Sequence, residues 1–430
     1  MNAPTRTPRA ARGGSRQSLW RDRGFLAYWT GQTVSRLGVQ IAGLALPLVA
    51  IAAFDASAFE LGIINAALFA PYLLFSMPAG AWIDRSRKRP VLVTADLVRF
   101  GVLVALAVLG MVGLVDMVTI CLVGFVMGTC AVFFDIAGSA YLPSIIGKDQ
   151  LLDGNGKLQA TIVFSKSGGP AVAGVLAELT SAAQTLFAGA ASSLLSVLAL
   201  LSSRRPETAP APREGGRDMV AEIRESLSFI IGNKYLRFLT IRSGVNNAFF
   251  VARNTLLPLF VLNTLDLSST ILGLVLGAGA VGALAGSMIA RPLAERTGLG
   301  RTIVIGFGTG SLVQVLLPLA GGPDWLAVAM LTSLFGISGC FMTIGNTNVA
   351  TLQQMLVPRE LLGRAVAGMR TVTWGSMPLG ALLGGALGTA LGLRTALAVV
   401  VVGFLASATW LALSPLTTMR NPLEDDDDDD

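Results

Sequence analysis

Long apolar stretches separated by short polar breaks follow one another along most of the chain. A helix needs about 20 mostly apolar residues to cross the ~30 Å hydrocarbon core of a bilayer. Twelve stretches meet this length, so the pattern predicts an all-α integral membrane protein with twelve transmembrane helices. The predicted spans are 25–53, 60–82, 91–112, 117–140, 158–179, 182–202, 238–262, 270–290, 302–320, 325–349, 365–390 and 395–414.

Composition supports the same class of protein. Of the 430 residues, 53% are hydrophobic and 13% are charged, against about 25% charged in an average soluble protein. The chain has no His, and Cys121, Cys130 and Cys340 lie in apolar stretches without paired spacing, so neither His catalysis nor a disulfide or metal site is expected. A phosphate-binding loop is not expected either, because Gly147-Lys148-Asp149 and Gly156-Lys157-Leu158 lack its final Ser or Thr. We therefore expect neither an enzyme nor an ATP-driven pump.

The distribution of basic residues predicts an orientation. Of the 32 Lys and Arg residues, 25 fall on the side of the predicted helices that carries both termini, and only Arg394 falls in a loop on the other side. Cytoplasmic loops are enriched in Lys and Arg. Both termini are therefore predicted to be cytoplasmic, and the net charge of +6 reflects this bias, with no nucleic-acid binding expected.

The chain repeats itself at a shift of 211 residues, which predicts two pseudo-symmetric six-helix bundles. Leu46-Pro47-Leu48 returns as Leu257-Pro258-Leu259, and Leu61-Gly62-Ile63 returns as Leu272-Gly273-Leu274. In the central loop, apolar residues at helical spacing predict an amphipathic helix over 217–232 along the membrane face, although a disordered linker is the alternative. The predicted organisation is a basic tail (1–23), a six-helix bundle (24–202), a linker (203–237), a second bundle (238–414) and an acidic tail (415–430).

The segment from Gly80 to Arg89, Gly-Ala-Trp-Ile-Asp-Arg-Ser-Arg-Lys-Arg, resembles motif A of the major facilitator superfamily. Arg87 stands where the family pattern has a second Gly, a departure that is usual in the branch of drug and siderophore exporters, which includes macrolide-efflux and enterobactin-exporter proteins. The resemblance implies a latch that holds the cytoplasmic side closed through carboxylates, guanidinium groups and helix ends. The alternative is that these charges only enforce topology. The latch residues implied are Gly80, Asp84, Arg85, Lys88, Arg89, Asp96, Arg99, Glu295 and Arg296.

A second motif resembles the Gly-Pro-rich motif C of antiporters in this superfamily. It runs from Ser165 to Gly174, with Gly169, Pro170 and Gly174 matching and Ser165 and Ala173 replacing glycines. Small residues permit close helix packing, and proline permits a bend. The resemblance implies export in preference to uptake.

Ionisable residues inside the spans are expensive in lipid and are functional candidates. Asp135 is the one acid deep inside a predicted span, and Arg36 and Lys166 lie at a similar depth. We expect Asp135 to carry or gate a proton, with Arg36 and Lys166 as coupling partners and Lys166 as the rival carrier. A permanent ion pair that never titrates is the alternative.

The resemblance places helices 1, 4, 7 and 10 around a central cavity. The excess of basic residues there weakly favours substrates with anionic, phenolic or carbonyl groups. The predicted substrate-binding residues are Gln32, Arg36, Gln40, Phe133, Asn246, Asn247, Phe249, Arg253, Asn346 and Asn348.

The expected function is export of a small amphipathic compound, such as a drug, siderophore or other natural product, by proton antiport with alternating access. A proton-coupled importer and a lipid or lysolipid transporter of the same fold are the alternatives. We expect a multi-pass monomer in the cell membrane whose partners are its substrate and the bilayer, without a cofactor.

Overall fold

The computed structural model describes residues 19–147, 150–202, 228, 230–357, 368–369 and 371–417, and its ordered elements are helices. The first half contains η1 (Leu19–Arg21), α1 (Arg23–Phe54), α2 (Ala58–Arg85), α3 (Lys88–Met111), α4 (Met117–Ile145), α5 (Leu151–Leu179) and α6 (Ala182–Ser202). The second half contains α8 (Lys234–Leu259), the π-helix η3 (Phe260–Thr264), α9 (Ser269–Thr297), α10 (Leu299–Leu312), η4 (Val313–Val315), α11 (Leu316–Leu319), α12 (Asp324–Leu356), α14 (Met377–Leu391), α15 (Leu393–Ala412) and η5 (Pro415–Thr417).

The predicted all-α membrane fold is confirmed. Eleven helical segments of the described chain are long and apolar enough to cross a bilayer. The remaining predicted span, 365–390, overlaps helical residues 371–375 and the 15-residue α14, while 358–367 and 370 lie outside the described residues. Most of the predicted amphipathic linker helix also lies outside them.

Polar residues between the apolar stretches start several of the helices. Ser57 and Glu60 form a reciprocal capping box at the start of α2, and the Asp116 carboxylate accepts a hydrogen bond from the Thr119 backbone N–H at the start of α4. Gly392 alone joins α14 to α15, and its φ of 77° is a left-handed conformation that glycine adopts without steric cost. The short breaks thus produce the tight reversals that a multi-span bundle requires.

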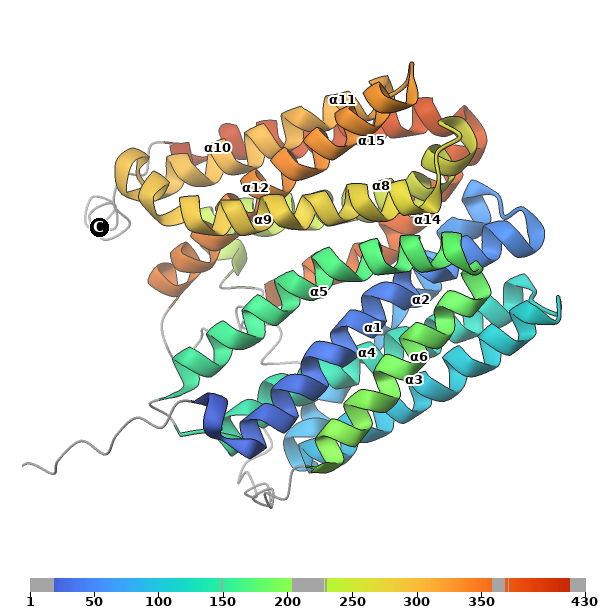
Figure 1. Cartoon of the computed structure of the whole chain (residues 1–430). Helices are drawn as coiled ribbons and strands as arrows, with labels where there is room; N and C mark the ends of the chain where they lie inside the picture. Colours follow the sequence, from blue (N-terminus) through green and yellow to red (C-terminus); the bar gives the residue numbers. More distant parts are fainter. Residues whose placement is uncertain are drawn as a thin grey trace, which may run out of the picture.

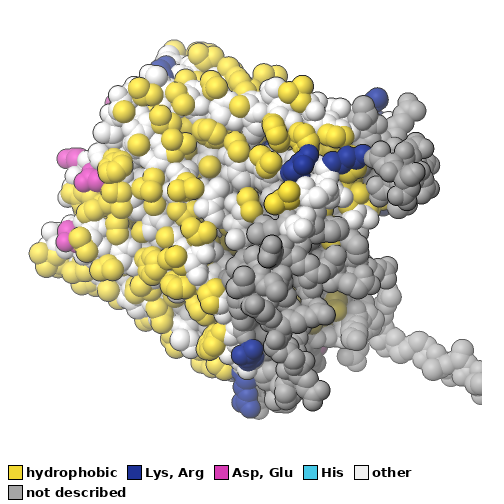
Figure 2. All heavy atoms as spheres, turned by 180° about the vertical axis from the view of Figure 1, so that it is seen from behind, with side chains coloured by type: hydrophobic (Ala, Val, Ile, Leu, Met, Phe, Trp, Pro, Cys, Tyr) yellow, Lys and Arg dark blue, Asp and Glu magenta, His cyan; other side chains and the backbone are white. Residues whose placement is uncertain are grey.

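The helices form two bundles that lie side by side and diverge toward one end (Figure 1). We call this end the termini side, because η1 begins and η5 ends there, and the opposite end the far side. The surface in Figure 2 is mostly apolar in its middle, with most of the visible Lys and Arg at the termini side and Asp and Glu at the far side. A broad apolar band between charged ends is the surface of a membrane-spanning protein.

Two close helix contacts join the halves near the far side. At the α2–α14 contact, a Cβ added to Gly62 would lie 3.0 Å from the Gly385 Cα; at the α5–α9 contact, a Cβ added to Gly174 would lie 3.1 Å from the Gly273 Cα. Gly273 follows Gly62 by 211 residues, and Gly385 follows Gly174 by the same 211. The internal repeat therefore generates both halves of the seam, which we call the glycine seam.

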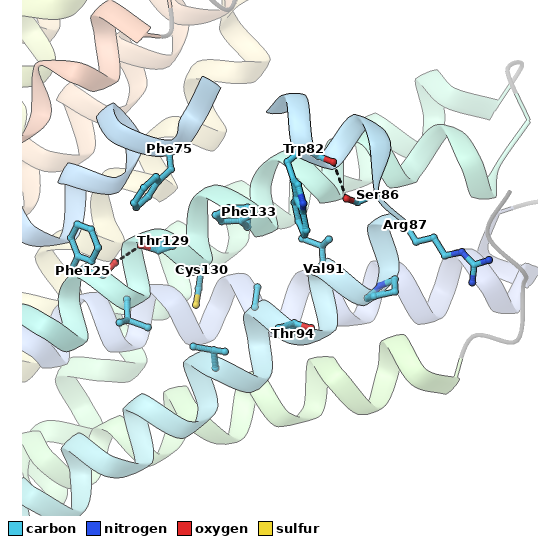
Figure 3. Close-up of a pocket in the computed structure, with 14 residues that line it drawn as sticks. Phe75, Trp82, Ser86, Arg87, Val91, Thr94, Phe125, Thr129, Cys130 and Phe133 are labelled. Carbon is cyan, nitrogen blue, oxygen red and sulfur yellow. Dashed lines mark hydrogen bonds between the residues drawn. The ribbon is translucent and has the colours of Figure 1, made fainter. Parts of the chain in front are cut away.

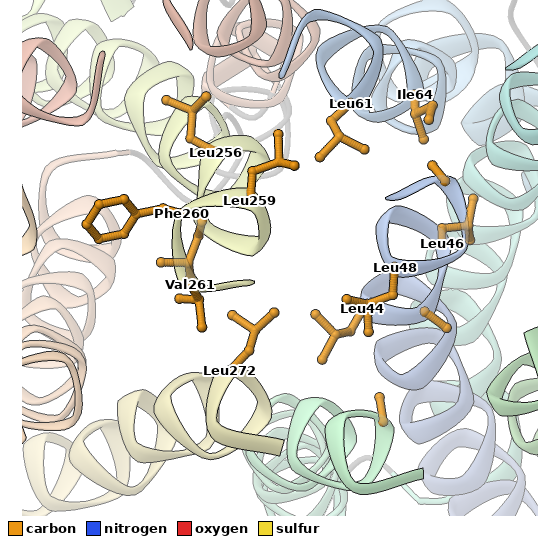
Figure 4. Close-up of a cluster of buried hydrophobic side chains, with 14 of the residues drawn as sticks. Leu44, Leu46, Leu48, Leu61, Ile64, Leu256, Leu259, Phe260, Val261 and Leu272 are labelled. Carbon is orange, nitrogen blue, oxygen red and sulfur yellow. The ribbon is translucent and has the colours of Figure 1, made fainter. Parts of the chain in front are cut away.

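Apolar side chains complete the far-side closure. Figure 4 shows Leu44 and Leu48 of α1 facing the second half, within a buried cluster that both halves share and that also contains Leu46. The other labelled members are Leu61, Ile64, Leu256, Leu259, Phe260, Val261 and Leu272. On the termini side, the buried clusters of the described residues each belong to one half. The halves are thus packed together at the far side and separate at the termini side.

Candidate transport site

An ion pair between α1 and α4 lies deep within the first half. The Arg36 Nη2 atom is 3.1 Å from the Asp135 Oδ1 atom, and the two side chains are 26% and 29% exposed. At 1.5 Å per residue, Asp135 lies roughly 15 Å along α4 from its termini-side end, and Arg36 roughly 20 Å along α1. The pair is therefore far inside the bundle but still reachable by water.

Neighbouring polar groups hold this pair in place. Arg36 Nε donates a 3.2 Å hydrogen bond to Gln32 Oε1, and the Tyr72 hydroxyl lies 3.5 Å from Asp135 Oδ2 in a long hydrogen bond. Gly138 leaves space for Gln32, since a Cβ there would lie 2.7 Å from the amide nitrogen of Gln32. These groups come from three different helices, α1, α2 and α4, and the packing of the helices brings them together. Local sequence alone does not reveal this arrangement.

Lys166 of α5 lies near this pair, within electrostatic range of Arg36 and Asp135, and its side chain is exposed. The structure thus brings together the three residues predicted for proton coupling. Among the described residues, the ion pair at this site joins Asp135 to Arg36.

Tyr72 also connects this site to the second half. Its ring meets the ring of Trp374 edge to face, with centroids 4.6 Å apart. Tyr72 belongs to α2, whereas Trp374 belongs to helical residues 371–375 that precede α14. One side chain therefore contacts both the Asp135 carboxylate and the opposite bundle.

Asp96 and Arg99 form a different ion pair inside the first half. Arg99 Nη1 lies 2.5 Å from Asp96 Oδ1, both side chains are buried, and Ser35 of α1 hydrogen-bonds to both of them. The Arg99 guanidinium also lies 5.5 Å from the centroid of the Phe134 ring. These predicted latch residues tie α3 to α1 within one bundle, away from the second half.

The other predicted latch residues sit at the termini side. Arg89 donates to the carbonyl oxygens of Leu200 and Leu201, while Glu295 pairs with Arg291 of its own helix at 2.8 Å. Gly80 lies in α2, Arg85 and Arg296 are exposed, Lys88 opens α3, and the side chain of Asp84 lies outside the described residues. With the halves apart at this side, no contact between Glu295 and the first half is recorded among the described residues.

The predicted motif C residues pack closely on other helices. A Cβ on Gly169 would lie 2.3 Å from the Gln40 Cβ atom of α1, and the Pro170 carbonyl oxygen lies against Gly273 of α9. Gly174 accepts a hydrogen bond from Ser269 through its carbonyl oxygen. Motif C thus supplies one contact of the glycine seam.

Several residues predicted to bind substrate lie within the second bundle instead. Phe249 packs on Gly403 and Phe404, Asn348 donates to the Ile344 and Ala290 carbonyl oxygens, and Arg253 donates to Gln314 and Asn254.

The remaining predicted residues are scattered. Asn246 accepts a hydrogen bond from the buried Arg242, Asn247 donates to the Thr373 carbonyl oxygen, and Asn346 is exposed. Phe133 lies in a groove formed by α2, α3 and α4 and contacts Trp82. In this conformation these side chains do not join the Arg36–Asp135 pair.

Tyr72, Trp374 and Ser35 were not predicted as site residues. They are uncharged at neutral pH and lie in apolar spans. A search of the sequence for charged residues inside the spans therefore does not find them. The glycine seam did leave a signal, since Gly62 and Gly273 stand in the repeated Leu-Gly segments.

Two related helical bundles, a far-side seam and a polar site between membrane helices define a membrane transporter of the major facilitator type. The chain belongs to the transmembrane secretion effector family of this superfamily, whose model matches residues 15–427.

Characterised relatives extend over most of the chain. The multidrug efflux pump Tap of Mycolicibacterium fortuitum is 27% identical over 372 residues, which cover 84% of this chain and 85% of the pump. Macrolide efflux protein A of Streptococcus pyogenes is 21% identical over 84% of this chain and 88% of its own length. The enterobactin exporter EntS of Salmonella typhi is 23% identical over 79% of this chain and 80% of its own length.

Solved structures share the fold at lower identity. A bacterial homologue of the iron transporter ferroportin in its inward-facing state has a TM-score of 0.73 and 17% identity, covering 94% of this chain and 100% of that chain. Its outward-facing structure gives a TM-score of 0.60.

Proposed function

We propose that this protein exports a small amphipathic compound in exchange for protons. The compound is a drug, a siderophore or another natural product, the classes named for the relatives Tap, macrolide efflux protein A and EntS. Both termini lie in the cytoplasm, an orientation supported by the concentration of Lys and Arg on the termini side. The termini side is then the cytoplasmic entrance.

The observation that carries the proposal is the partly exposed Arg36–Asp135 ion pair. Coupling to protons requires a group inside the membrane whose charge changes, and a carboxylate in contact with water meets this requirement. In the conformation open to the termini side, Asp135 is ionised and paired with Arg36. Substrate enters from the cytoplasm while the carboxylate holds its charge.

Alternating access completes the cycle. The halves come together at the termini side, where the motif A latch closes, and the glycine seam opens at the far side. A proton from outside then neutralises Asp135 as substrate leaves, so Arg36 loses its anionic partner. Loss of the Arg36–Asp135 ion pair favours return to the first conformation, where the proton is released.

Reconstitution of the whole chain in liposomes tests this proposal. A radiolabelled macrolide and a radiolabelled catecholate siderophore serve as probes, with a pH gradient as the only energy source. Asp135→Asn is expected to abolish uphill transport while leaving probe binding and downhill exchange largely intact. Asp324→Asn, which alters an exposed far-side carboxylate, is the control and is expected to transport normally.

Concentration of either probe by Asp135→Asn at the wild-type rate would overturn the role of Asp135. Movement of both probes in the same direction as protons would instead identify an importer.

A further inference from the structure

A groove on the outer side of the first half has no role in the export cycle. Its cavity of about 620 Å³ is lined by α2, α3, α4 and the turn between α2 and α3 (Figure 3). α4 packs against both α2 and α3 and forms the floor. α3 lies on the outer side of its bundle (Figure 1), and the groove residues Trp82 and Val98 are 54% and 42% exposed. The groove therefore opens toward the surrounding lipid.

The groove offers little to a polar ligand. Its walls carry the rings of Phe75, Trp82, Phe125 and Phe133 together with aliphatic side chains. The Ser86 hydroxyl donates to the Trp82 carbonyl oxygen and the Thr129 hydroxyl donates to the Phe125 carbonyl oxygen, each at 2.8 Å (Figure 3). Besides these two hydroxyl groups, whose protons are already engaged, the polar side chains of the lining are Thr94 and Arg87, so an apolar chain suits the groove better than a compound with many hydrogen-bonding groups.

One end of the groove is cationic. Arg87 lines it there and extends beyond it, toward the termini side (Figure 3). Arg87 is exposed and directly precedes the first residue of α3. The Arg87 guanidinium attracts an anion such as phosphate, and the positive end of the α3 dipole at the same place adds to this attraction.

We propose that this groove binds an anionic phospholipid, with one acyl chain between α2 and α3 and the phosphate at Arg87. The apolar chain matches the aromatic walls, and the phosphate matches the guanidinium and the helix end at headgroup level. The proposal also gives Arg87 a function at the position where the motif A pattern has Gly. It is independent of the direction of transport and of Asp135.

Fluorescence quenching tests the proposal on the purified full-length protein in detergent. Brominated phosphatidylglycerol and brominated phosphatidylcholine are titrated separately, and the signal from Trp82 is obtained as the difference from Trp82→Phe. Phosphatidylglycerol is expected to quench this signal at a concentration several times lower than phosphatidylcholine. Arg87→Gln is expected to remove the preference, and Val98→Phe, which narrows the groove, is expected to weaken quenching by both lipids.

Arg301→Gln is the matched control, since it removes an exposed basic residue from the first turn of α10 in the other half. It is expected to keep the preference. Equal quenching by the two lipids, or an unchanged preference in Arg87→Gln, would overturn the proposal. Recovery of the quenched Trp82 fluorescence on addition of the macrolide or the siderophore, but not of unbrominated phosphatidylglycerol, would show that the groove is a substrate site. That result would overturn the lipid proposal as well.

Discussion

The Tyr72 and Trp374 rings meet across the boundary between the two bundles, with centroids 4.6 Å apart. The Tyr72 hydroxyl also points to the Asp135 carboxylate. A change in charge at Asp135 is thereby connected, through one side chain, to the segment leading into α14.

We expect Trp374→Ala to lower the population of the conformation open to the termini side. An aromatic pair contributes about 1 kcal/mol beyond its buried area, which corresponds to roughly a fivefold change in an equilibrium. Distances between spin labels at Ser202 and Arg301, on the termini side of each half, measure this shift in a variant without the three native cysteines. Trp374→Phe keeps a ring and should stay near wild type, and a distribution unchanged in Trp374→Ala would contradict the link.

Tyr72→Phe separates the two contacts of this side chain. The ring remains against Trp374, while the hydroxyl beside Asp135 is removed. We expect a nearly unchanged distance distribution but slower proton-driven export, because the carboxylate loses a donor. Equal export rates at every pH gradient would show that the hydroxyl has no part in coupling.

Substitutions of Arg36 and Lys166 distinguish the two carriers considered for the proton. Arg36→Lys keeps the charge but loses the planar fork that reaches Asp135 and Gln32 together. Losing a hydrogen bond to a charged group costs about 1.5–3 kcal/mol, so export should fall about tenfold or more. Lys166→Gln should retain pH-driven export. Loss of uphill export in Lys166→Gln, with activity kept in Asp135→Asn, would assign the proton to Lys166.

The glycine seam makes a prediction about far-side closure. Gly174→Ala places a Cβ 2.3 Å from the Ser269 carbonyl oxygen, and Gly385→Ala places one 2.8 Å from that of Ala58. Both should favour the conformation open at the far side, measured with spin labels at Thr180 and Asn263. Gly156→Ala, in α5 but with open space around it, is the control. A wild-type distribution in both seam variants would contradict the seam.

The buried Asp96–Arg99 pair predicts a loss of stability. Asp96→Asn leaves the Arg99 guanidinium buried without its anion, which destabilises by about 3–5 kcal/mol. The temperature at which the detergent-solubilised protein loses its monodisperse size-exclusion peak should fall clearly. Glu295→Gln breaks a pair that is 61–89% exposed and should change little, because water screens such pairs. Normal stability with altered conformational distances in Asp96→Asn would instead favour a latch role.

The sequence by itself determined the class of protein and most of its spans. A stretch of about 20 apolar residues is stable in a bilayer as a helix, because a helix satisfies its own backbone hydrogen bonds. The apolar run between Met117 and Ile145 therefore predicts a transmembrane span without any tertiary information. The repeat at 211 residues likewise identified two related halves, and the cost of charge in lipid singled out Asp135, Arg36 and Lys166.

Tertiary structure alone decided which polar residues share a site. Helical spacing shows which side chains share a face of one helix, but not what that face contacts. In the structure Phe249, Arg253 and Asn348 pack inside the second bundle. Tyr72 and Trp374 are 302 positions apart in the sequence, and their contact depends on the angle at which the bundles meet. That angle is set by backbone approach at Gly62, Gly174, Gly273 and Gly385, where the packing of two bundles, rather than any local preference, fixes the geometry.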